Sequence, residues 1–267
     1  MDGKLGELVA VLENMESAVV AYSGGLDSAF LLKLATDTLG ERALGLTAVS
    51  PSLPARERLD AQRIASHLGA RHEMVESREL NDPNYANNPQ NRCYYCKREL
   101  YSITDARRVE LGFVWVINGT NVDDLGDYRP GLQAASEAGV RSPFVEVGLS
   151  KREIRELARD AALDFWDKPA AACLSSRVPY GTRVTPERLS RIERLEEALK
   201  ALGFIQVRVR LHDDLARIEL DAADLRRALE ERSQILDAGS RTGFRYITLD
   251  LAGYRTGSFN ERLPVFK

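Results

Sequence analysis

Short apolar runs alternate with longer amphipathic segments along the N-terminal half of the chain, which predicts strands separated by helices. The strands are predicted over 17–22, 43–50, 71–77 and 114–120, and the helices over 54–68 and 97–111. Connections of this length favour right-handed crossovers and a parallel sheet, whose ligands bind at the carboxyl ends of the strands.

The pattern changes in the C-terminal part of the chain. A helix over 151–162 and a short apolar run over 163–166 complete the first region, and Lys168-Pro169 interrupts the periodicity. A helix over 186–202, strands over 204–211 and 215–220, a helix over 222–236 and a strand over 244–249 follow. Because 267 residues exceed the usual size of a single core, we expect an α/β domain over 1–170 and a smaller α+β domain over 171–267.

Composition narrows the choice of partners. A content of 44% hydrophobic and 29% charged residues is ordinary for a globular protein, and a formal net charge of -3 gives no bulk attraction for nucleic acid or membranes. Charged residues interrupt the first twenty positions, and no stretch approaches the roughly 20 apolar residues of a membrane span. We therefore expect a cytoplasmic protein without a membrane partner.

The hexapeptide Ser-Gly-Gly-Leu-Asp-Ser over 23–28 lies between the first predicted strand and an apolar helical segment. Two glycines, Gly24 and Gly25, allow close backbone approach, and the helix N-terminus presents N–H groups and a positive dipole end to an anion. Ser23 and Ser28 can donate to phosphate oxygens, and Asp27 can hold a divalent cation. The alternative interpretation is a tight turn without a ligand.

A second polar loop, Gly-Thr-Asn-Val-Asp-Asp over 119–124, follows the fourth predicted strand. Because the carboxyl ends of parallel strands share one edge of the sheet, Thr120, Asp123 and Asp124 should face the same crevice as the hexapeptide. Its aspartates can help to hold a metal ion or a ribose, whereas a loop of this composition is also typical of a simple turn.

Three cysteines form an odd set, which excludes a framework of paired disulfides alone. Cys93 and Cys96 are three residues apart at the start of a predicted helix, and Cys173 lies near the expected domain boundary. Three thiolates suit an iron–sulfur cluster with one open iron, or a zinc ion with another ligand. A redox pair, a structural zinc half-site and two buried thiols are the alternatives for Cys93 and Cys96.

Six segments together resemble the LarE family of ATP-dependent sulfur transferases, which belongs to the ATP pyrophosphatase superfamily. They are SGGLDS at 23–28, NRCYYCKRELY at 91–101, GTNVDDLGDYRPG at 119–131, AACLSSRVPYG at 171–181, VRVRLHDDLARIEL at 207–220 and LDLAGYRTGSFNE at 249–261. The resemblance implies an N-terminal domain of the adenine nucleotide alpha hydrolase type and a C-terminal domain for substrate binding and oligomerisation. It implies adenylation by ATP of the carboxylates of pyridinium-3,5-biscarboxylic acid mononucleotide and their conversion to thiocarboxylates, for the nickel-pincer nucleotide cofactor of lactate racemase.

Members of that family obtain sulfur in two ways. Some give up the sulfur of one cysteine, at the position of Cys173, and are consumed. Others use three cysteines to hold a [4Fe-4S] cluster that carries an extra sulfide, and Cys93, Cys96 and Cys173 match that pattern. The resemblance therefore implies a cluster-dependent enzyme that needs a sulfide or another sulfur donor, and that forms trimers or hexamers.

The same resemblance implies roles for individual residues. Asp27 would hold Mg²⁺, and Lys97 would reach phosphate, although it also suits a solvated helix position. The anionic substrate needs guanidinium groups, and Arg208 and Arg210 share one face of a predicted strand, where they alternatively form a polar outer face. The remaining candidates for the substrate pocket are Ser176, Arg177, Glu196, Glu219, Arg255 and Ser258, of which the glutamates are ion partners of the arginines or surface carboxylates.

Two other functions fit parts of the sequence. A tRNA thiolase of the same superfamily would need a basic surface or an RNA module, for which only the arginines at 183, 188, 191 and 194 offer support. A nucleotide sensor without catalysis would need only the anion-binding hexapeptide and a metal.

The three histidines, His67, His72 and His212, show no ligand spacing, and we expect Trp115 and Trp166 to pack the sheet from predicted strands.

Overall fold

A computed structural model describes residues 2–126, 130–169 and 171–255. The chain divides into two compact units, which we call the first unit (1–85 and 90–172) and the second unit (86–89 and 173–267). The short segment 86–89 joins the second unit because its backbone and side chains bind residues 178–184. The amide N–H of Val184 donates to the carbonyl of Ala86 over 2.8 Å, and the Asn88 side-chain amide donates to the carbonyl of Pro179 over 2.7 Å.

A four-stranded parallel sheet forms the centre of the first unit. Its strands are β1 (Ala18–Ala21), β2 (Ala43–Val49), β3 (His72–Glu76) and β4 (Trp115–Ile117), in the order β3-β2-β1-β4. All three pairings are parallel, and Ala18 at the start of β1 lies opposite Ala43 and Trp115. The predicted α/β class with a parallel sheet is confirmed, and the order places β1 and β4 side by side so that the loops after them meet.

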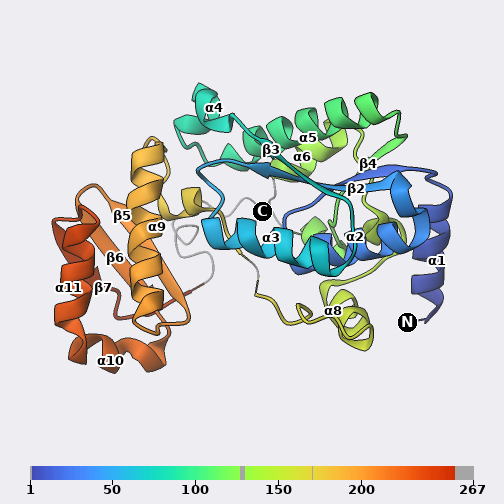
Figure 1. Cartoon of the computed structure of the whole chain (residues 1–267). Coiled ribbons are helices and arrows are strands. Elements are labelled where there is room, and N and C mark those ends of the chain that lie inside the picture. The colour runs from blue at the N-terminus through green and yellow to red at the C-terminus, as the bar shows by residue number, and fades with distance from the viewer. Residues whose placement is uncertain (1, 127–129, 170, 256–267) are drawn as a thin grey trace. The chain divides into compact units, whose positions relative to one another are not determined.

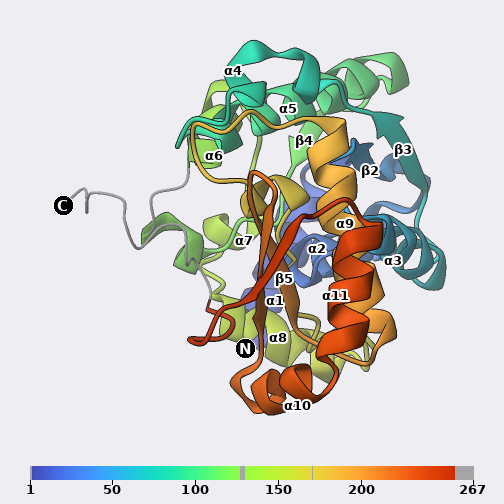
Figure 2. The ribbon, with the colours of Figure 1, turned by 90° about the vertical axis from the view of Figure 1, so that its left-hand side faces the viewer.

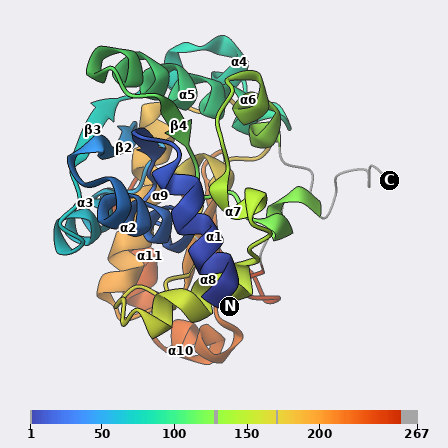
Figure 3. The same cartoon turned by 90° about the vertical axis from the view of Figure 1, so that its right-hand side faces the viewer.

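Helices cover both faces of this sheet (Figure 1). On one face lie α5 (Arg92–Leu111) and α6 (Pro130–Glu137), and on the other lie α2 (Leu26–Leu39) and α3 (Ala55–His67). Two further helices, α1 (Asp2–Glu13) and α8 (Lys151–Asp160), pack against α2 (Figure 3). The short elements are η1 (Gly40–Arg42), η2 (Glu79–Asn81), α4 (Pro83–Ala86), η3 (Val122–Gly126) and α7 (Pro143–Glu146).

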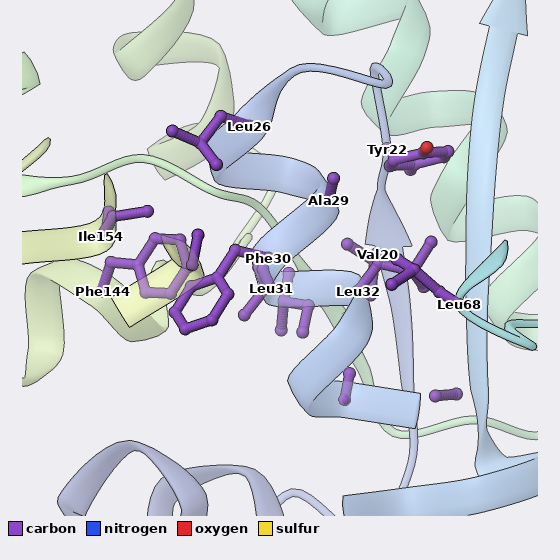
Figure 4. Packing of buried hydrophobic residues seen from close by; sticks show 14 of the residues in the cluster. Val20, Tyr22, Leu26, Ala29, Phe30, Leu31, Leu32, Leu68, Phe144 and Ile154 are labelled. Carbon is purple, nitrogen blue, oxygen red and sulfur yellow. The ribbon is translucent and has the colours of Figure 1, made fainter. Parts of the chain in front are cut away.

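The main hydrophobic core lies around α2, of whose 14 residues eight are buried (Figure 4). Phe30 of α2 stacks on Phe144 of α7 with ring centroids 6.1 Å apart, and Val20 of β1 belongs to the same buried cluster. A helix that is enclosed on this scale is fixed by burial of its side chains rather than by helix propensity. The N-terminus of α2 is therefore held rigidly beside the end of β1.

Two predictions about the first unit are wrong. The helix expected over 97–111 begins five residues earlier, at Arg92, so both cysteines lie inside it. The run 163–166 forms turns instead of a strand, because Ala162 has a φ of 53° and the chain leaves helical geometry there. Trp166 consequently does not pack the sheet and is 39% exposed, whereas Trp115 lies in β4 against the core as expected.

The second unit contains a three-stranded sheet in the order β5-β6-β7 (Figure 1), and Figure 2 shows the side of the molecule on which β5 is labelled. Its strands are β5 (Val207–His212), β6 (Leu215–Leu220) and β7 (Tyr246–Leu249), and β6 runs antiparallel to β5 and parallel to β7. Its helices are η4 (Leu174–Arg177), α9 (Pro186–Ala201), η5 (Ala222–Asp224), α10 (Leu225–Glu230) and α11 (Arg232–Arg241). The expected α+β composition is thus present.

The single helix predicted over 222–236 is wrong in its extent. The chain forms η5, α10 and α11 in succession, and α11 continues to Arg241. Glu231, between α10 and α11, has a φ of −91° and a ψ of 16°, which lie outside helical geometry.

Among the described residues, no helix is long and apolar enough to cross a membrane.

Candidate active site

The loop over 23–28, which we call the anion loop, joins the end of β1 to the N-terminus of α2. The Ser23 and Ser28 hydroxyl groups lie 3.0 Å apart, and the amide N–H groups of Ser23 and Gly25 donate to Ser28 Oγ and Ser23 Oγ over 3.1 and 3.3 Å. Gly25 is the N-cap of α2 and provides no side-chain cap. The first-turn N–H groups of α2 therefore point out of the helix end without an intrahelical acceptor, which is the arrangement that binds anions.

Two glycines let neighbouring backbone come close to the anion loop. Gly24 has a φ of 75°, and a Cβ atom there would lie 2.8 Å from the Cβ atom of Ala61 in α3. A Cβ atom on Gly119, which follows β4, would lie 2.8 Å from the backbone nitrogen of Ser28. The loop after β4 thus packs directly on the anion loop, as the parallel topology predicts.

Asp27, in the first turn of α2, combines a paired and an unpaired oxygen. Its Oδ2 accepts a hydrogen bond from the ammonium of Lys151, and its Oδ1 is buried with no hydrogen-bond partner among the described residues. Burial raises the pKa of this carboxyl, an effect that Lys151 partly offsets. A buried carboxylate oxygen without a partner fits a divalent cation, because Mg²⁺ prefers carboxylate oxygens.

Lys151 links Asp27 to the loop after β4, and sequence reasoning did not identify it. It is the first residue of α8, and its backbone N–H donates to Asp123 Oδ2 over 2.8 Å. A signal was available, because Ser150 and Glu153 form a capping box that fixes the helix start at Lys151. Lys168 was also missed as a site residue, although its ammonium lies 3.2 Å from the carbonyl oxygen of Gly24.

Thr120 and Asp123 belong to turns that follow β4. The Thr120 N–H donates to Asn118 Oδ1 and the Asp123 N–H donates to Asn121 Oδ1, each over 3.0 Å. The turn alternative thus describes this loop's own hydrogen bonds, yet the turn also holds the Asp123 carboxylate against the N-terminus of α8. The loop after β4 is therefore a turn that also positions the Asp123 carboxylate at the start of α8.

Cys93 and Cys96 lie one turn apart in the N-terminal part of α5, with Cys93 exposed and Cys96 half-buried. Lys97 follows, and its ammonium lies 6.0 Å from the ring centroid of Tyr101, whose hydroxyl accepts a hydrogen bond from the Asn118 amide over 3.1 Å. Within the described residues of the first unit, no third His, Cys, Asp or Glu completes a metal-binding group with this pair. Further ligands would have to come from elsewhere, and the contribution of Cys173 stays a prediction.

Cys173, in the second unit, is exposed and precedes η4. Its carbonyl oxygen accepts three hydrogen bonds, from the N–H of Ser176 over 3.0 Å, from the Ser176 hydroxyl over 2.8 Å and from the Arg177 guanidinium over 3.0 Å. Arg177 is itself paired with Glu196 of α9 through two bonds of 2.9 and 3.1 Å, and both side chains are buried. The backbone at Cys173 is therefore held by a rigid buried ion pair while its thiol faces solvent.

Arg208 and Arg210 share one face of β5, but their surroundings differ. Arg210 pairs with Glu219 of β6 over 2.9 Å, and Glu219 is fully buried and also binds Arg217. In the described part of the chain no carboxylate forms an ion pair with Arg208, which donates to the Val207 carbonyl. Burial and the nearby positive charge of Arg177 lower the pKa of Arg208, so this guanidinium is suited to an added anion.

The remaining candidate residues are two glutamates, Arg255 and Ser258 of the C-terminal part of the chain, and the three histidines. Glu196 and Glu219 are buried ion partners of arginines and not surface carboxylates. Arg255 is exposed, and Ser258 lies outside the described residues. His67 and His212 are exposed at the ends of α3 and β5, and His72 is within hydrogen-bond distance of the Thr47 hydroxyl at 2.8 Å.

Comparison with known proteins finds full-length relatives, although no family model matches the chain. The chain is 46% identical over 98% of its length to an uncharacterised protein of Synechocystis, of which it covers 99%. It is 38% identical over 97% of its length to a pyridinium-3,5-bisthiocarboxylic acid mononucleotide synthase of Lactiplantibacillus plantarum, of which it covers 95%. An uncharacterised protein of Methanocaldococcus jannaschii is 29% identical over 89% of the chain, which covers 90% of that relative.

Proposed function

Because the chain belongs to the pyridinium-3,5-bisthiocarboxylic acid mononucleotide synthase (LarE) family, we propose that it is an ATP-dependent sulfur transferase acting on pyridinium-3,5-biscarboxylic acid mononucleotide. Family membership makes it an enzyme of pyridinium bisthiocarboxylate synthesis. The finer steps are our inference: each carboxylate is first adenylated by ATP, and the activated acyl group then receives sulfur. The two steps use different groups of the chain.

The first unit supplies the adenylation step. A carboxylate oxygen of the substrate attacks the α-phosphorus of ATP, the bond from that phosphorus to the bridging oxygen breaks, and pyrophosphate leaves. The N–H groups at the start of α2 would bind phosphate oxygens, and Asp27 would hold Mg²⁺ through its unpaired Oδ1. Lys151 and Lys97 would add positive charge next to the departing pyrophosphate.

The second unit contributes Cys173, which would act in the transfer step as a ligand of the centre that delivers sulfur. Sulfur attacks the acyl carbon, and AMP leaves with the original carboxylate oxygen, so that one oxygen is exchanged for one sulfur. The hydrogen bonds to the Cys173 carbonyl would fix the backbone that carries the exposed thiol during this step. Cys93, Cys96 and Cys173 have the soft donors that suit a [4Fe-4S] cluster, and such a cluster supplies a sulfide that can be replaced after each transfer.

Arg208 is the residue best placed to bind the anionic substrate. It lacks a carboxylate partner in the described chain, and its guanidinium lies 5.3 Å from the ring centroid of Tyr254. Arg177, Arg210, Glu196 and Glu219 would act by holding the surrounding frame, and Ser176 would present its hydroxyl beside Cys173. A trimer or hexamer, expected from the resemblance, and a role for Arg255 remain part of the proposal.

An RNA substrate has less support, because the guanidinium groups of three of the four arginines that would favour it, Arg188, Arg191 and Arg194, bind backbone carbonyls within the second unit. The Arg191 guanidinium donates to the Gly243 carbonyl over 2.6 Å and lies 4.4 Å from the ring centroid of Phe244. The Arg194 guanidinium contacts the carbonyl of Thr242. These side chains join α9 to the end of α11, which is a structural role.

The observation that carries the proposal is the anion loop with its unpaired Asp27 oxygen, in a chain that matches a member of this family over 97% of its length. The test supplies ATP, Mg²⁺ and the pyridinium dicarboxylate without RNA, and follows pyrophosphate and the mass of the substrate. We expect substrate-dependent pyrophosphate release and products with one and then two oxygens replaced by sulfur, and we expect both signals to be lost in Asp27→Asn. Release that requires RNA would instead identify a tRNA thiolase, and ATP binding without any release would identify a sensor.

A further inference from the structure

A lysine near the end of the first unit holds one peptide of the anion loop. The ammonium of Lys168 donates to the carbonyl oxygen of Gly24 over 3.2 Å, and it lies 3.0 Å from Glu57 Oε2 and 3.1 Å from Asp60 Oδ2. The three acceptors match the three N–H donors of an ammonium group, and the Lys168 side chain is only 13% exposed. All four residues belong to the first unit, so the contact lies within one compact body.

Helix α3 fixes the position of this ammonium. Asp60 and Ala61 follow Glu57 by three and four residues along α3, so the three side chains share one face of the helix. The two carboxylates hold Lys168, and a Cβ atom on Gly24 would lie 2.8 Å from the Cβ atom of Ala61. Because α3 packs against the same glycine whose carbonyl Lys168 binds, the ammonium and the loop are held in one relative position.

The contact selects one of two orientations of the peptide between Gly24 and Gly25. In a planar trans peptide the carbonyl and the N–H point in opposite directions. Lys168 binds the carbonyl end, and the N–H end faces the Ser23 hydroxyl at 3.3 Å. That hydroxyl lies 3.0 Å from the Ser28 hydroxyl, so the Gly25 N–H joins the donors that bind phosphate oxygens in the proposed function.

The opposite orientation is accessible to this peptide because both of its residues are glycine. Turning a peptide over changes ψ of its first residue and φ of its second residue by about 180°. Gly25 has a φ of −80°, so the turned peptide would give it a positive φ, which glycine adopts readily and other residues resist. The Gly24 carbonyl oxygen would then face the phosphate and repel it. The glycines therefore leave the orientation unspecified, and the hydrogen bond from Lys168 specifies it.

We propose that Lys168 is a positioning residue that keeps the N–H of Gly25 directed at the bound anion. The inference rests on the proposed function, in which the anion loop binds phosphate groups of ATP. A phosphate on the N–H side and the ammonium on the carbonyl side polarise the peptide in the same sense, so each strengthens the hydrogen bond of the other. Lys168 thus acts on the anion through the peptide, and its removal weakens binding only if the peptide is able to turn.

The test is a double-mutant cycle of Lys168→Met and Gly25→Ala, with the Kd for ATP and Mg²⁺ measured by calorimetry on the full-length chain. We expect Lys168→Met alone to raise the Kd about 10-fold, because only molecules with the peptide in the binding orientation take the ligand. In the Gly25→Ala background the same substitution should raise the Kd less than about 3-fold, because alanine resists the positive φ of the turned peptide. A Cβ atom on Gly25 would lie 3.4 Å from Ser23 Oγ, an ordinary contact, so alanine fits the orientation that Lys168 holds.

Controls separate positioning from charge and from folding. A purely electrostatic or structural role of Lys168 would weaken binding equally in both backgrounds. Lys4→Met is the matched control, because Lys4 also binds a glycine carbonyl and a glutamate, Gly148 over 2.7 Å and Glu153 over 2.8 Å, and it should bind ATP as the original chain does. A melting curve shows whether each variant is folded. If Lys168→Met is not, the cycle is run with Glu57→Gln in every variant, which removes one of the two carboxylates left facing each other.

The outcomes distinguish the inference from the function on which it rests. Equal losses in the two backgrounds, or no loss in Lys168→Met, overturn the role of Lys168 and leave the proposed function standing. Complete loss of ATP binding in Gly25→Ala alone does the same, because it shows that the bound loop needs the positive φ of the turned peptide. An original chain that does not bind ATP overturns the proposed function and the inference together.

Discussion

The anion loop and the arginine face both prepare a site for an anion, but they do so by different physical means. By the arginine face we mean Arg208 and Arg210 of β5 together with Arg177 of η4 and Arg217 of β6. The anion loop uses backbone N–H groups at the start of α2 and needs glycine where other backbone comes within contact distance. The arginine face uses charged side chains, and its arginines other than Arg208 bind buried or half-buried carboxylates. In the first case the fold itself makes the site, and in the second case ion pairs build a frame around Arg208, which forms no ion pair with the residues that the structure describes.

This difference predicts whether a substitution should mainly change stability or mainly change ligand binding. Buried ion pairs contribute structure, because removal of one partner leaves a charge without compensation. An unpaired charge or an unpaired oxygen contributes ligand binding at the expense of stability. The structure therefore assigns stability to Glu219 and Arg210, and ligand binding to Arg208 and Asp27.

The largest expected effect is a loss of stability when the buried ion pairs that Glu219 forms with Arg210 and Arg217 are broken. Glu219→Ala leaves Arg210 and Arg217 without their shared carboxylate, and we expect the free energy of unfolding to fall by about 3–5 kcal/mol. Urea denaturation measures it. The matched control is Glu197→Ala, which removes an exposed partner of Lys200 and should change stability by less than about 0.5 kcal/mol. Equal effects of the two substitutions would contradict the assignment of Glu219 to the frame.

Substitution of Arg208 should mainly weaken substrate binding, and substitution of Arg210 should mainly lower stability. Arg208→Met should weaken binding of the pyridinium mononucleotide about 10- to 100-fold, the range for a hydrogen bond to a charged group, with little loss of stability. Arg210→Met should mainly destabilise the fold, because buried Glu219 then loses the guanidinium that lies 2.9 Å from it. Calorimetry with the substrate and urea denaturation give the two quantities. The comparison fails if both variants lose affinity and stability to the same extent.

A backbone site should be sensitive to a single methyl group. Gly119→Ala places a Cβ atom 2.8 Å from the backbone nitrogen of Ser28, so the loop after β4 must move, and we expect a loss of about 1–3 kcal/mol in stability together with weaker ATP binding. Gly6→Ala is the control, because a Cβ atom there meets nothing within 4 Å and alanine favours the helix α1. Unchanged ATP binding in Gly119→Ala would show that the packing of this loop does not shape the anion loop.

The smallest effect concerns Asp27 and depends on pH. A carboxyl whose folded pKa is raised destabilises the folded state above that pKa, and the penalty disappears below its ordinary value of 3.8. Asp27→Asn should therefore be slightly more stable than the original chain at pH 7, with the gain shrinking as the pH falls toward 4. Urea denaturation at the two pH values tests the sign, and a gain that grows on acidification would contradict it.

The sequence predicted the parts of the molecule that depend on local patterns. Apolar runs and glycine positions located the sheet of the first unit and the anion loop, because both follow from strand–helix alternation. The division of labour between Arg208 and Arg210 was not predictable, since strand alternation places them on the same face and only the carboxylate of Glu219 on β6 distinguishes them. Lys151 and Lys168 were missed because the partners of their side-chain ammonium groups are more than a hundred residues away in the sequence.

The central claim is that Cys93, Cys96 and Cys173 act at one centre. The most direct measurement is the iron, acid-labile sulfide and visible absorption of an anaerobic preparation, compared with Cys93→Ala, in which Cys173 is intact. We predict that the original chain shows all three signals and multiple turnovers, and that the variant loses the signals and the turnover together. A variant that keeps its iron and continues to turn over would contradict the claim.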